Sequence, residues 1–309
     1  MYNYKINNKL LLSCLEKNHI SIFLFHGVVK KKTENNFVDY INKHLDKTHF
    51  EKIIRFLKFH GKSLSMSEAV YILENKLEIP KKAFVITFDD GFKNNYEIAC
   101  PILDYYKINS IFYVTSSFIE ENKNSWIDDI EIDLINTKIE KVNLYNKLFK
   151  ITSNEEKKSF LEFIRHEVKI KNNTKIIETV KKVFSEKSYN INKTDDYDEY
   201  YRKMDWDNVI SLSQNPLFEV GGHTHTHCIL GHTSKENIEF EIKKNQFLIK
   251  KNMSKAPIHF SYPEGQSYSF NSLVIDTLKN YKYKSSVTTL DNINNYEVDL
   301  FKLNRITIN

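Results

Sequence analysis

Two short segments of the chain combine residue types that can hold a divalent metal ion and activate water. In the first, Asp89 and Asp90 form a carboxylate pair directly after an apolar run and before a glycine. In the second, three histidines alternate within residues 223–227, after a double glycine. Carboxylate and imidazole ligands suit zinc or a similar divalent ion, and a catalytic site needs three protein ligands and an open position. One carboxylate and two histidines would supply those ligands, and the other carboxylate would remain as a base.

Each segment also has a plainer interpretation. Asp-Gly pairs are frequent in turns, where Asp90 would cap the following helix, and an isolated histidine is most often a surface or hydrogen-bonded residue. Three histidines within five residues, in a chain with 11 in all, favour a functional site. In an extended segment His225 would point away from its neighbours, so we expect it to lie outside the ligand set.

The two segments follow apolar runs that alternate with amphipathic stretches, a pattern typical of β/α units. Near-continuous apolar character indicates parallel strands that are covered on both faces. Helix starts are predicted by three capping boxes, Thr48 with Glu51, Ser65 with Glu68, and Thr233 with Glu236. The predicted strands are residues 20–26, 83–88, 110–115, 218–221, 258–262 and 285–289.

One region interrupts this alternation. No proline lies between Pro101 and Pro216, no glycine lies between Gly91 and Gly221, and residues 128–203 are highly charged with helical apolar spacing. We therefore predict a single domain over residues 1–309 that carries a helical insertion at about 128–203, with a polar loop at 190–201.

Composition excludes several classes of protein. A hydrophobic fraction of 41% can build a core, and a net charge of +5 from dispersed lysines, without a basic block, predicts no nucleic-acid partner. Three cysteines that lie far apart suit a reducing compartment better than a disulfide framework. The apolar runs near the N-terminus are too short for a signal peptide or a transmembrane helix. We expect a cytoplasmic protein, which could act at the inner membrane surface.

Glycine is scarce in the chain, yet it gathers beside the candidate chemical residues. Glycine is required where a backbone turns sharply or approaches a ligand closely. Because glycine is scarce in this chain, the loops that retain it are expected to mark the functional end of the fold. Five of the seven glycines lie in such loops, at positions 27, 91, 221, 222 and 265.

Taken in order, these motifs resemble those of the polysaccharide deacetylase family, also called the NodB-homology domain or carbohydrate esterase family 4. Residues 87–91 read Thr-Phe-Asp-Asp-Gly, residues 223–227 fit His-Ser/Thr-x-x-His, and residues 263–265 form a Pro-x-Gly loop. The resemblance covers residues 20–308 outside the insertion. It implies an α/β fold, a distorted (β/α) barrel with catalytic residues at the carboxyl ends of its strands.

The resemblance assigns expected roles to the two motifs. Asp89 corresponds to the general base that activates water. Asp90, His223 and His227 correspond to the metal ligands, and Zn²⁺ is the expected ion, with Co²⁺ or Ni²⁺ as alternatives.

The Pro-x-Gly loop has expected roles as well. In the family, a backbone N–H of this loop stabilises the oxyanion, and the corresponding residue here is Glu264. We also expect Tyr262, directly before the loop, to line the substrate cleft.

The sequence departs from the family pattern in two places. No histidine follows His259, so the C-terminal histidine that usually acts as general acid is missing. His26 ends an apolar run placed before the Asp motif, as in circularly permuted members, and we expect it to be the acid; a backbone-bonded strand-end histidine is the alternative.

The second departure is the missing arginine of the Pro-x-Gly motif, which pairs with the base in the family. Ser261 stands in its place, and we expect Arg305 to pair with Asp89 instead of lying on the surface.

The resemblance implies a metal-dependent hydrolase that removes an N-acetyl or other N-acyl group from an amino sugar of a glycan. The expected location favours a cytoplasmic glycan precursor as substrate. One alternative is a deacylase or deformylase of a non-sugar amide on the same fold. The other is a non-catalytic glycan-binding relative, and the intact set of acidic and histidine residues counts against it.

Overall fold

The computed structural model describes residues 8–15, 18–187 and 197–309. They divide into two compact units, which are described separately. The barrel unit comprises Met1–Lys31, Lys43–Lys123 and Arg202–Asn309, and the insertion unit comprises Lys32–Asn42 and Asn124–Tyr201. We predicted a single domain over residues 1–309 with an insertion at about 128–203, and this stays a prediction. The insertion unit contains most of that insertion together with residues 32–42.

The barrel unit is built on one curled parallel sheet with the strand order β11-β10-β9-β6-β5-β1-β12, and β4 pairs with β5. The sheet forms a distorted half-barrel, and an isolated parallel bridge pairs Val287 at one edge with Leu303, three residues before the strand at the other edge. All six predicted runs contain strands, some one or two residues shorter than expected. The strands are β1 Ile20–Phe25, β4 Lys62–Ser63, β5 Ala83–Phe88, β6 Ser110–Val114, β9 Phe218–Gly222, β10 His259–Ser261, β11 Ser285–Val287 and β12 Ile306–Thr307.

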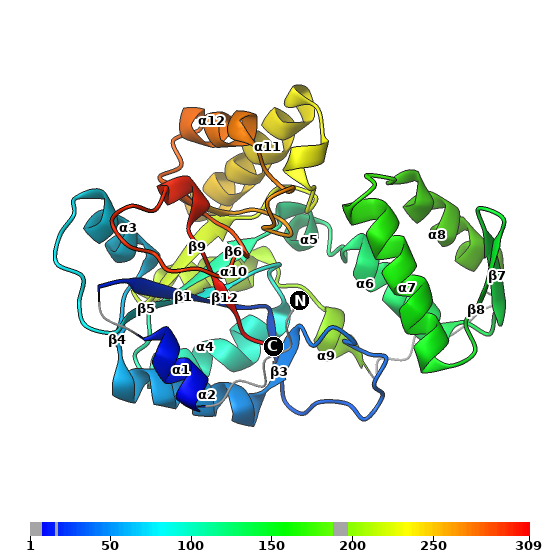
Figure 1. Cartoon of the computed structure of the whole chain (residues 1–309), viewed down its shortest axis with the longest axis horizontal. Coiled ribbons are helices and arrows are strands. Elements are labelled where there is room, and N and C mark those ends of the chain that lie inside the picture. Colours follow the sequence, from blue (N-terminus) through cyan, green and yellow to red (C-terminus); the bar gives the residue numbers. More distant parts are fainter. Residues whose placement is uncertain (1–7, 16–17, 188–196) are drawn as a thin grey trace. The chain divides into compact units, whose positions relative to one another are not determined.

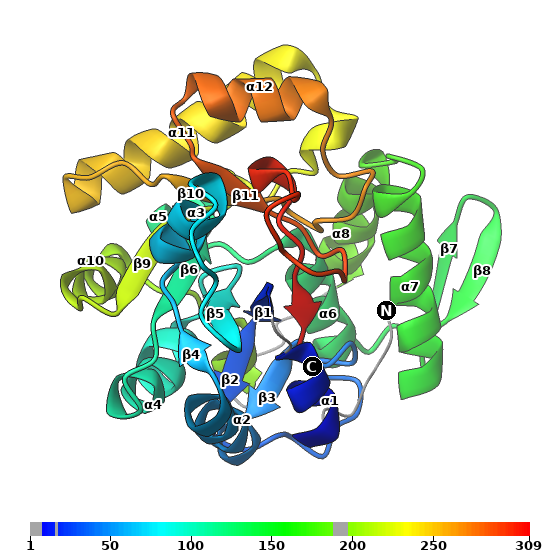
Figure 2. The same cartoon turned by 60° about the vertical axis from the view of Figure 1, so that its left-hand side comes forward.

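The strands are buried on both faces, which explains their continuous apolar sequences. Alternate residues face opposite sides of the sheet. Ile22 and Val85 pack inside the curl, whereas Phe23 and Phe84 pack against the surrounding helices. Figure 2 shows these helices outside the strands. They include α2 Lys47–His60, α4 Cys100–Tyr105, α10 Trp206–Gln214, α11 Lys235–Met253 and α12 Ser272–Asn280.

Of the three predicted capping boxes, the one at α3 (Met66–Glu74) is confirmed, with Ser65 and Glu68 bonded reciprocally. The other two predictions were wrong. Helix α2 is capped by Asp46 at the end of β3 (His44–Asp46), which pairs with β2 (Gly27–Val29). Helix α11 is capped by Ser234, because the preceding residue closes a short 3₁₀ turn.

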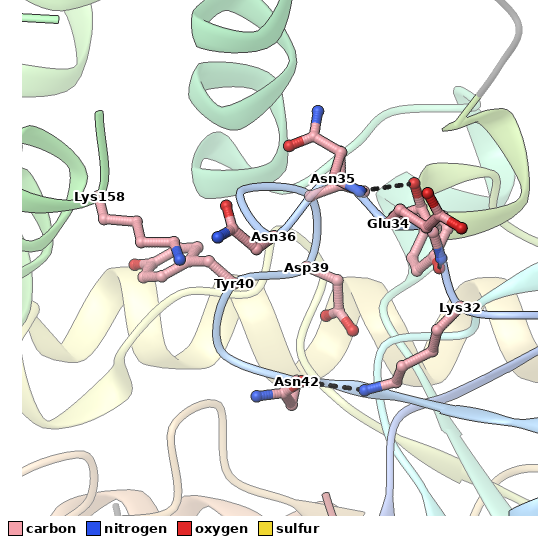
Figure 3. Close-up of a pocket in the computed structure, with 11 residues that line it drawn as sticks. Lys32, Glu34, Asn35, Asn36, Asp39, Tyr40, Asn42 and Lys158 are labelled. Atoms are coloured by element: carbon pink, nitrogen blue, oxygen red, sulfur yellow. Dashed lines mark hydrogen bonds between the residues drawn. The ribbon is translucent and has the colours of Figure 1, made fainter. Parts of the chain in front are cut away.

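The insertion unit, whose helices and hairpin are labelled in Figure 1, has its own apolar core, which includes Phe37 of the loop 32–42. The sequence predicted only helices, but an antiparallel hairpin lies among them, with its turn residues Tyr145 and Asn146 in the left-handed region. A polar pocket opens beside the loop (Figure 3). The elements are α6 Trp126–Asn136, β7 Lys141–Leu144, β8 Lys147–Lys150, α7 Asn154–Lys169, α8 Lys175–Lys187 and α9 Asp198–Tyr201.

Two sequence predictions concern other parts of the chain. Residues 190–196 of the predicted loop lie outside the described residues, and residues 198–201 form α9. Near the N-terminus, α1 spans Asn8–Cys14. Among the described residues, no helix combines the length and the apolar character that crossing a membrane requires.

Candidate active site

Strand register brings the predicted functional loops to one edge of the barrel sheet. Phe25 of β1 pairs with Phe88 of β5, so His26 and Asp89 leave the sheet side by side. The N–H of Asp89 donates to the carbonyl of Phe25 at 3.1 Å. The end of β9 lies between β6 and β10, and the N–H of His223 donates to the carbonyl of Val114 at 3.2 Å. Residues far apart in sequence therefore meet at the carboxyl ends of neighbouring strands.

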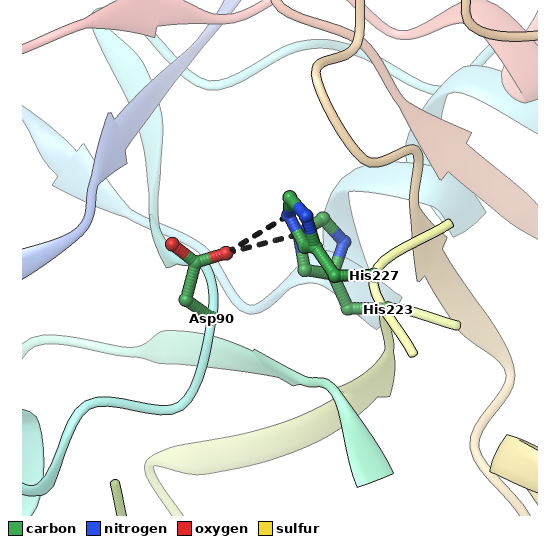
Figure 4. A group of neighbouring side chains, drawn as sticks. All are labelled: Asp90, His223 and His227. Carbon is green, nitrogen blue, oxygen red and sulfur yellow. Dashed lines mark ion pairs between the residues drawn. The ribbon is translucent and has the colours of Figure 1, made fainter. Parts of the chain in front are cut away.

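Asp90, His223 and His227 converge on one point at this edge (Figure 4). Oδ1 of Asp90 lies 3.3 Å from Nε2 of His223 and 3.2 Å from Nε2 of His227. Metal–ligand bonds of about 2.0–2.1 Å place neighbouring ligand atoms about 2.9–3.4 Å apart. Two of the three separations match this geometry, so the group could hold a single divalent ion.

A hydrogen bond orients the His223 ring for this task. Nδ1 of His223 lies 2.7 Å from the carbonyl oxygen of Ser261, which can only accept, so Nδ1 carries the proton. In the neutral ring, Nε2 would then offer its lone pair to a metal ion, as in the second-sphere arrangement of many metal-binding histidines. Burial would raise the pKa of Asp90, but hydrogen bonds from His223 and His227 hold it well below its usual range. Asp90 is thus an anion that could serve as a metal ligand.

Several residues of the site hold backbone conformations that non-glycine residues seldom adopt. Such conformations cost about 1–3 kcal/mol each and persist where the surroundings fix them, often at active sites. Two of them are ligands in the predicted metal group, so their side chains are aimed by the backbone itself. The residues and their φ angles are Asp90 at 71°, Thr224 at 61°, His227 at 60° and Glu264 at 66°.

Helix α11 holds the loop that joins the two histidine ligands. The buried carboxylate of Glu241 accepts from the N–H groups of His225 and Thr226, both at 2.8 Å, and from the Thr226 hydroxyl at 2.6 Å. One turn later, the buried amide of Asn245 donates to the carbonyls of Thr224 and Val114 at 2.7 and 3.0 Å. Neither of these positioning residues was predicted from the sequence. Their signal was present, because they occupy core positions of an amphipathic helix where apolar residues are expected.

His225 lies outside the ligand group, as the alternation of the segment predicted. Its Nδ1 lies 3.0 Å from the hydroxyl of Ser116, and its ring meets Phe240 edge to face. Its contacts therefore anchor the loop to helix α5 (Ser116–Glu120) and to α11.

Arg305 makes the pairing with Asp89 that the sequence analysis expected. Its Nη1 and Nη2 donate to the two carboxylate oxygens of Asp89 at 2.8 and 2.7 Å. The remaining N–H groups donate to the Thr288 carbonyl, the Thr87 hydroxyl and the Ser261 hydroxyl. Arg305 is completely buried, and all five of its donors are used. Asp89 is therefore fixed in one orientation by a fork that a lysine could not reproduce.

The charge state of Asp89 follows from these contacts. Burial would raise the pKa of its carboxyl, but Arg305 and His223 outweigh that effect and lower it. Ser261 also donates its hydroxyl to Asp89 at 3.0 Å while its backbone carbonyl receives His223. One residue at the end of β10 thus connects the anionic Asp89 with the metal group.

His26 is half-buried at the end of β1, beside both carboxylates. Burial lowers its pKa, and Asp90 and Asp89 counteract that shift in part. Within the part of the chain that the structure describes, its buried Nδ1 has no hydrogen-bond partner. The backbone-bonded alternative therefore finds no support at this nitrogen.

The loop after β10 is pinned from the neighbouring β11 segment. The N–H of Thr289 donates to the carbonyl of Gly265 at 2.9 Å, and its hydroxyl donates to the carbonyl of Glu264 at 2.7 Å. Gly265 has φ +62°, and a Cβ there would lie 2.5 Å from the Thr289 nitrogen. Only glycine fits this position, and the peptides on either side of Gly265 are held in place.

The prediction that Tyr262 lines the substrate cleft was wrong. Its side chain is completely buried, its hydroxyl donates to the Phe301 carbonyl at 2.9 Å, and its ring stacks on Phe270. Successive residues at a strand end point to opposite sides. Ser261 points to the site, and Tyr262 consequently points into the core.

These features define the class of protein. The family model for polysaccharide deacetylases matches residues 76–286, and the chain belongs to this family. Curated relatives include the poly-beta-1,6-N-acetyl-D-glucosamine N-deacetylases of Staphylococcus aureus strains MSSA476 and N315. Each is 34% identical over 128 residues, which make up 38% of this chain and 40% of the relative. The match thus spans less than half the length of either protein.

Solved structures share the fold over nearly the whole chain. The Streptococcus pyogenes deacetylase PplD, solved in complex with acetate, has a TM-score of 0.61 at 18% identity, covering 94% of this chain and 92% of that one. IcaB from Ammonifex degensii has a TM-score of 0.60 at 13% identity, with 95% and 93% covered. At these identities the likeness establishes the predicted α/β half-barrel fold.

Proposed function

We propose that the protein is a divalent-metal-dependent N-deacetylase that removes acetyl groups from amino sugars of a polysaccharide. One observation carries the proposal. Asp90, His223 and His227 converge as a metal-binding group beside Asp89, a buried carboxylate that Arg305 holds ionised. A metal group next to an oriented base is the minimum apparatus for hydrolysing an amide with activated water.

Zinc is the ion we propose for the site. Two imidazoles and one carboxylate form the ligand set of many catalytic zinc sites, which leave a position open. Cobalt or nickel would fit the same ligands. A bound ion would lower the pKa of water and polarise the acetyl carbonyl.

The chain's own residues have separate roles in this proposal. Asp89 accepts a proton from the attacking water, and Arg305 keeps its carboxylate oriented. The N–H of Glu264 donates to the oxyanion that forms on the acetyl oxygen. His26 donates a proton to the departing amine, since an amine leaves readily only once it is protonated. The lowered pKa of His26 makes its protonated form a stronger acid.

For the substrate we propose a polymer of N-acetylglucosamine. The curated relatives carry names that specify poly-β-1,6-N-acetyl-D-glucosamine, and this chain belongs to a family named for polysaccharide deacetylation. A β-1,6-linked oligomer is consequently the first substrate to test.

The test is acetate release by the full chain after metal removal and reloading with zinc or cobalt. β-1,6-linked and β-1,4-linked N-acetylglucosamine oligomers are compared with formamides and simple acetamides. We expect acetate from an oligomer, and loss of that activity on chelation. Release only from simple amides would favour a non-sugar deacylase. Binding of oligomers without any release would favour a non-catalytic relative.

A further inference from the structure

The insertion unit contains a pocket that the catalytic proposal does not use. Its volume is about 320 Å³, and every residue that lines it belongs to this unit (Figure 3). Most of the lining comes from the loop 32–42, with Lys158 from α7 and Tyr200 from α9. Ligand pockets in proteins begin at about 300 Å³, so this pocket is suited to a ligand of a single ring.

Hydrogen bonds to other parts of the insertion unit hold the loop that forms most of the pocket wall. The N–H of Thr33 donates to the Tyr200 hydroxyl at 2.8 Å, and the N–H of Asp39 donates to the buried Glu131 at 2.7 Å. Asp39 and Asn42 both have left-handed backbone conformations, with φ of 54° and 55°. The loop thus has a fixed shape before any ligand binds, which reduces the entropy that binding would cost.

The pocket presents donors and acceptors together. Figure 3 shows the Asp39 carboxylate, the Asn42 amide and the Lys32 ammonium around the same space, with Lys32 bonded to Asn42 at 3.0 Å. The amide of Asn36 and the ammonium of Lys158 also line it. Hydroxyl groups donate and accept at once, so such a mixed lining matches a polyhydroxylated ligand.

Charge and polarity disfavour other ligand classes. Two lysines in the lining are balanced by Glu34 and Asp39, so the pocket has no excess positive charge for a phosphate. Among the described residues that line the pocket, Val38 is the only aliphatic one, and such a lining does not suit an apolar ligand. Tyr40 adds an aromatic ring stacked nearly parallel on Phe37, a rigid surface against which a sugar ring can pack.

We propose that this pocket binds one pyranose unit of the polysaccharide, apart from the unit that is deacetylated. The identity of the polymer rests on the proposed function. Several identical units along one polymer raise the effective concentration of sugar at the pocket, so a long oligomer should bind there more tightly than a single sugar.

The test measures binding by the full chain carrying Asp89→Asn, which keeps substrate from being consumed. Asn36→Ala and Lys158→Ala alter the pocket, and Asn143→Ala and Lys150→Ala make the same changes on the exposed hairpin of the same unit. Affinity for an N-acetylglucosamine hexamer is measured by calorimetry. We expect the two pocket changes together to weaken it about five- to tenfold, the loss of one or two hydrogen bonds. Hairpin variants should bind as before, and equal affinity in all variants would overturn the proposal.

A second measurement does not depend on the variants. Amide hydrogen exchange of the same protein is followed with the acetylated hexamer and with its deacetylated counterpart, which represent substrate and product. Slower exchange in residues 32–42 with either hexamer supports the pocket, and unchanged exchange with both overturns it. If the wild-type chain releases no acetate but the loop is still protected, the proposed function fails and the sugar site stands.

Discussion

Two aspartate–cation pairs of nearly equal length lie in opposite surroundings. In the barrel unit, Nη2 of Arg305 lies 2.7 Å from Asp89, and the side chains are 0% and 5% exposed. In the insertion unit, Nζ of Lys181 lies 2.6 Å from Asp129, with 42% and 36% exposed. An exposed pair contributes about 0–1 kcal/mol, whereas removing one partner of a buried pair costs about 3–5 kcal/mol. The contrast shows that distance alone does not identify a functional ion pair.

The two units also differ in how their charged pairs are surrounded. The barrel unit buries Asp89 and Arg305 in a fixed network at the strand ends, which is how a catalytic site is pre-organised. The insertion unit also buries charged groups, Glu131 among them, but its pair of Lys181 and Asp129 is partly exposed to solvent. We therefore expect substitutions in the barrel pair to affect chemistry and stability, and matched substitutions in the insertion pair to affect neither.

The largest contrast should come from the two aspartates. Asp89→Asn removes the base, and we expect kcat/KM for acetate release to fall about 10³-fold. Asp129→Asn should change it less than about twofold, because that carboxylate is solvated. Steady-state kinetics on an N-acetylated oligomer measures both. Comparable losses in the two variants would remove the distinction between the pairs.

Removing the cation of each pair should change the free energy of unfolding by different amounts. Arg305→Met leaves Asp89 buried without its partner, and we expect the free energy of unfolding to drop by about 3–5 kcal/mol. Lys181→Met should cost about 1 kcal/mol or less. Urea denaturation of the two variants and the wild type gives the values. A loss below about 1 kcal/mol for Arg305→Met would mean that the buried pair does not stabilise the fold.

Replacing one histidine in each unit should give a smaller difference in kcat. His26→Gln should lower kcat about 10²-fold while the chain still binds its metal, because a general acid is lost and the ligands are untouched. His166→Gln, on the exposed face of α7, should leave kcat as it was. Metal content and turnover are measured on the same samples. Normal turnover in His26→Gln would exclude this residue as the acid.

The smallest expected effect is on metal affinity, and it compares two carboxylates on helix α11. Glu241→Gln replaces an acceptor of three hydrogen bonds with an amide, and we expect metal affinity to fall about 10- to 100-fold, as for other residues that orient ligands. Glu239→Gln, exposed on α11, is the matched control. Competition with a chelator measures both affinities. Equal affinities would show that the loop is held without Glu241.

Much of the site could be predicted from the sequence, because its residues sit in short motifs at strand ends. Asp89, Asp90, His223 and His227 are local signals of this kind. Arg305 lies 216 positions from Asp89, yet it could be proposed since arginine is rare in this chain and the family requires one near the base. Zinc, the cytoplasmic location and the circular permutation stay predictions.

Other features depend on tertiary structure that short patterns do not encode. Whether Tyr262 or Ser261 faces the site is decided by where β10 ends, a matter of one residue. Glu241 reaches its loop through a helix that packs on the sheet. The loop 32–42 joins the insertion across about 90 residues of sequence, as in the contact of Asp39 with Glu131.

The central claim is that Asp90, His223 and His227 hold one divalent ion on which deacetylation depends. The most direct measurement titrates the metal-free chain with zinc while acetate release from an N-acetylglucosamine oligomer is recorded. We predict that activity rises in proportion to zinc and levels off at one ion per chain, and that His223→Ala with His227→Ala abolishes both binding and release. Acetate release at the full rate without metal, or unchanged zinc binding in the double variant, would contradict the claim.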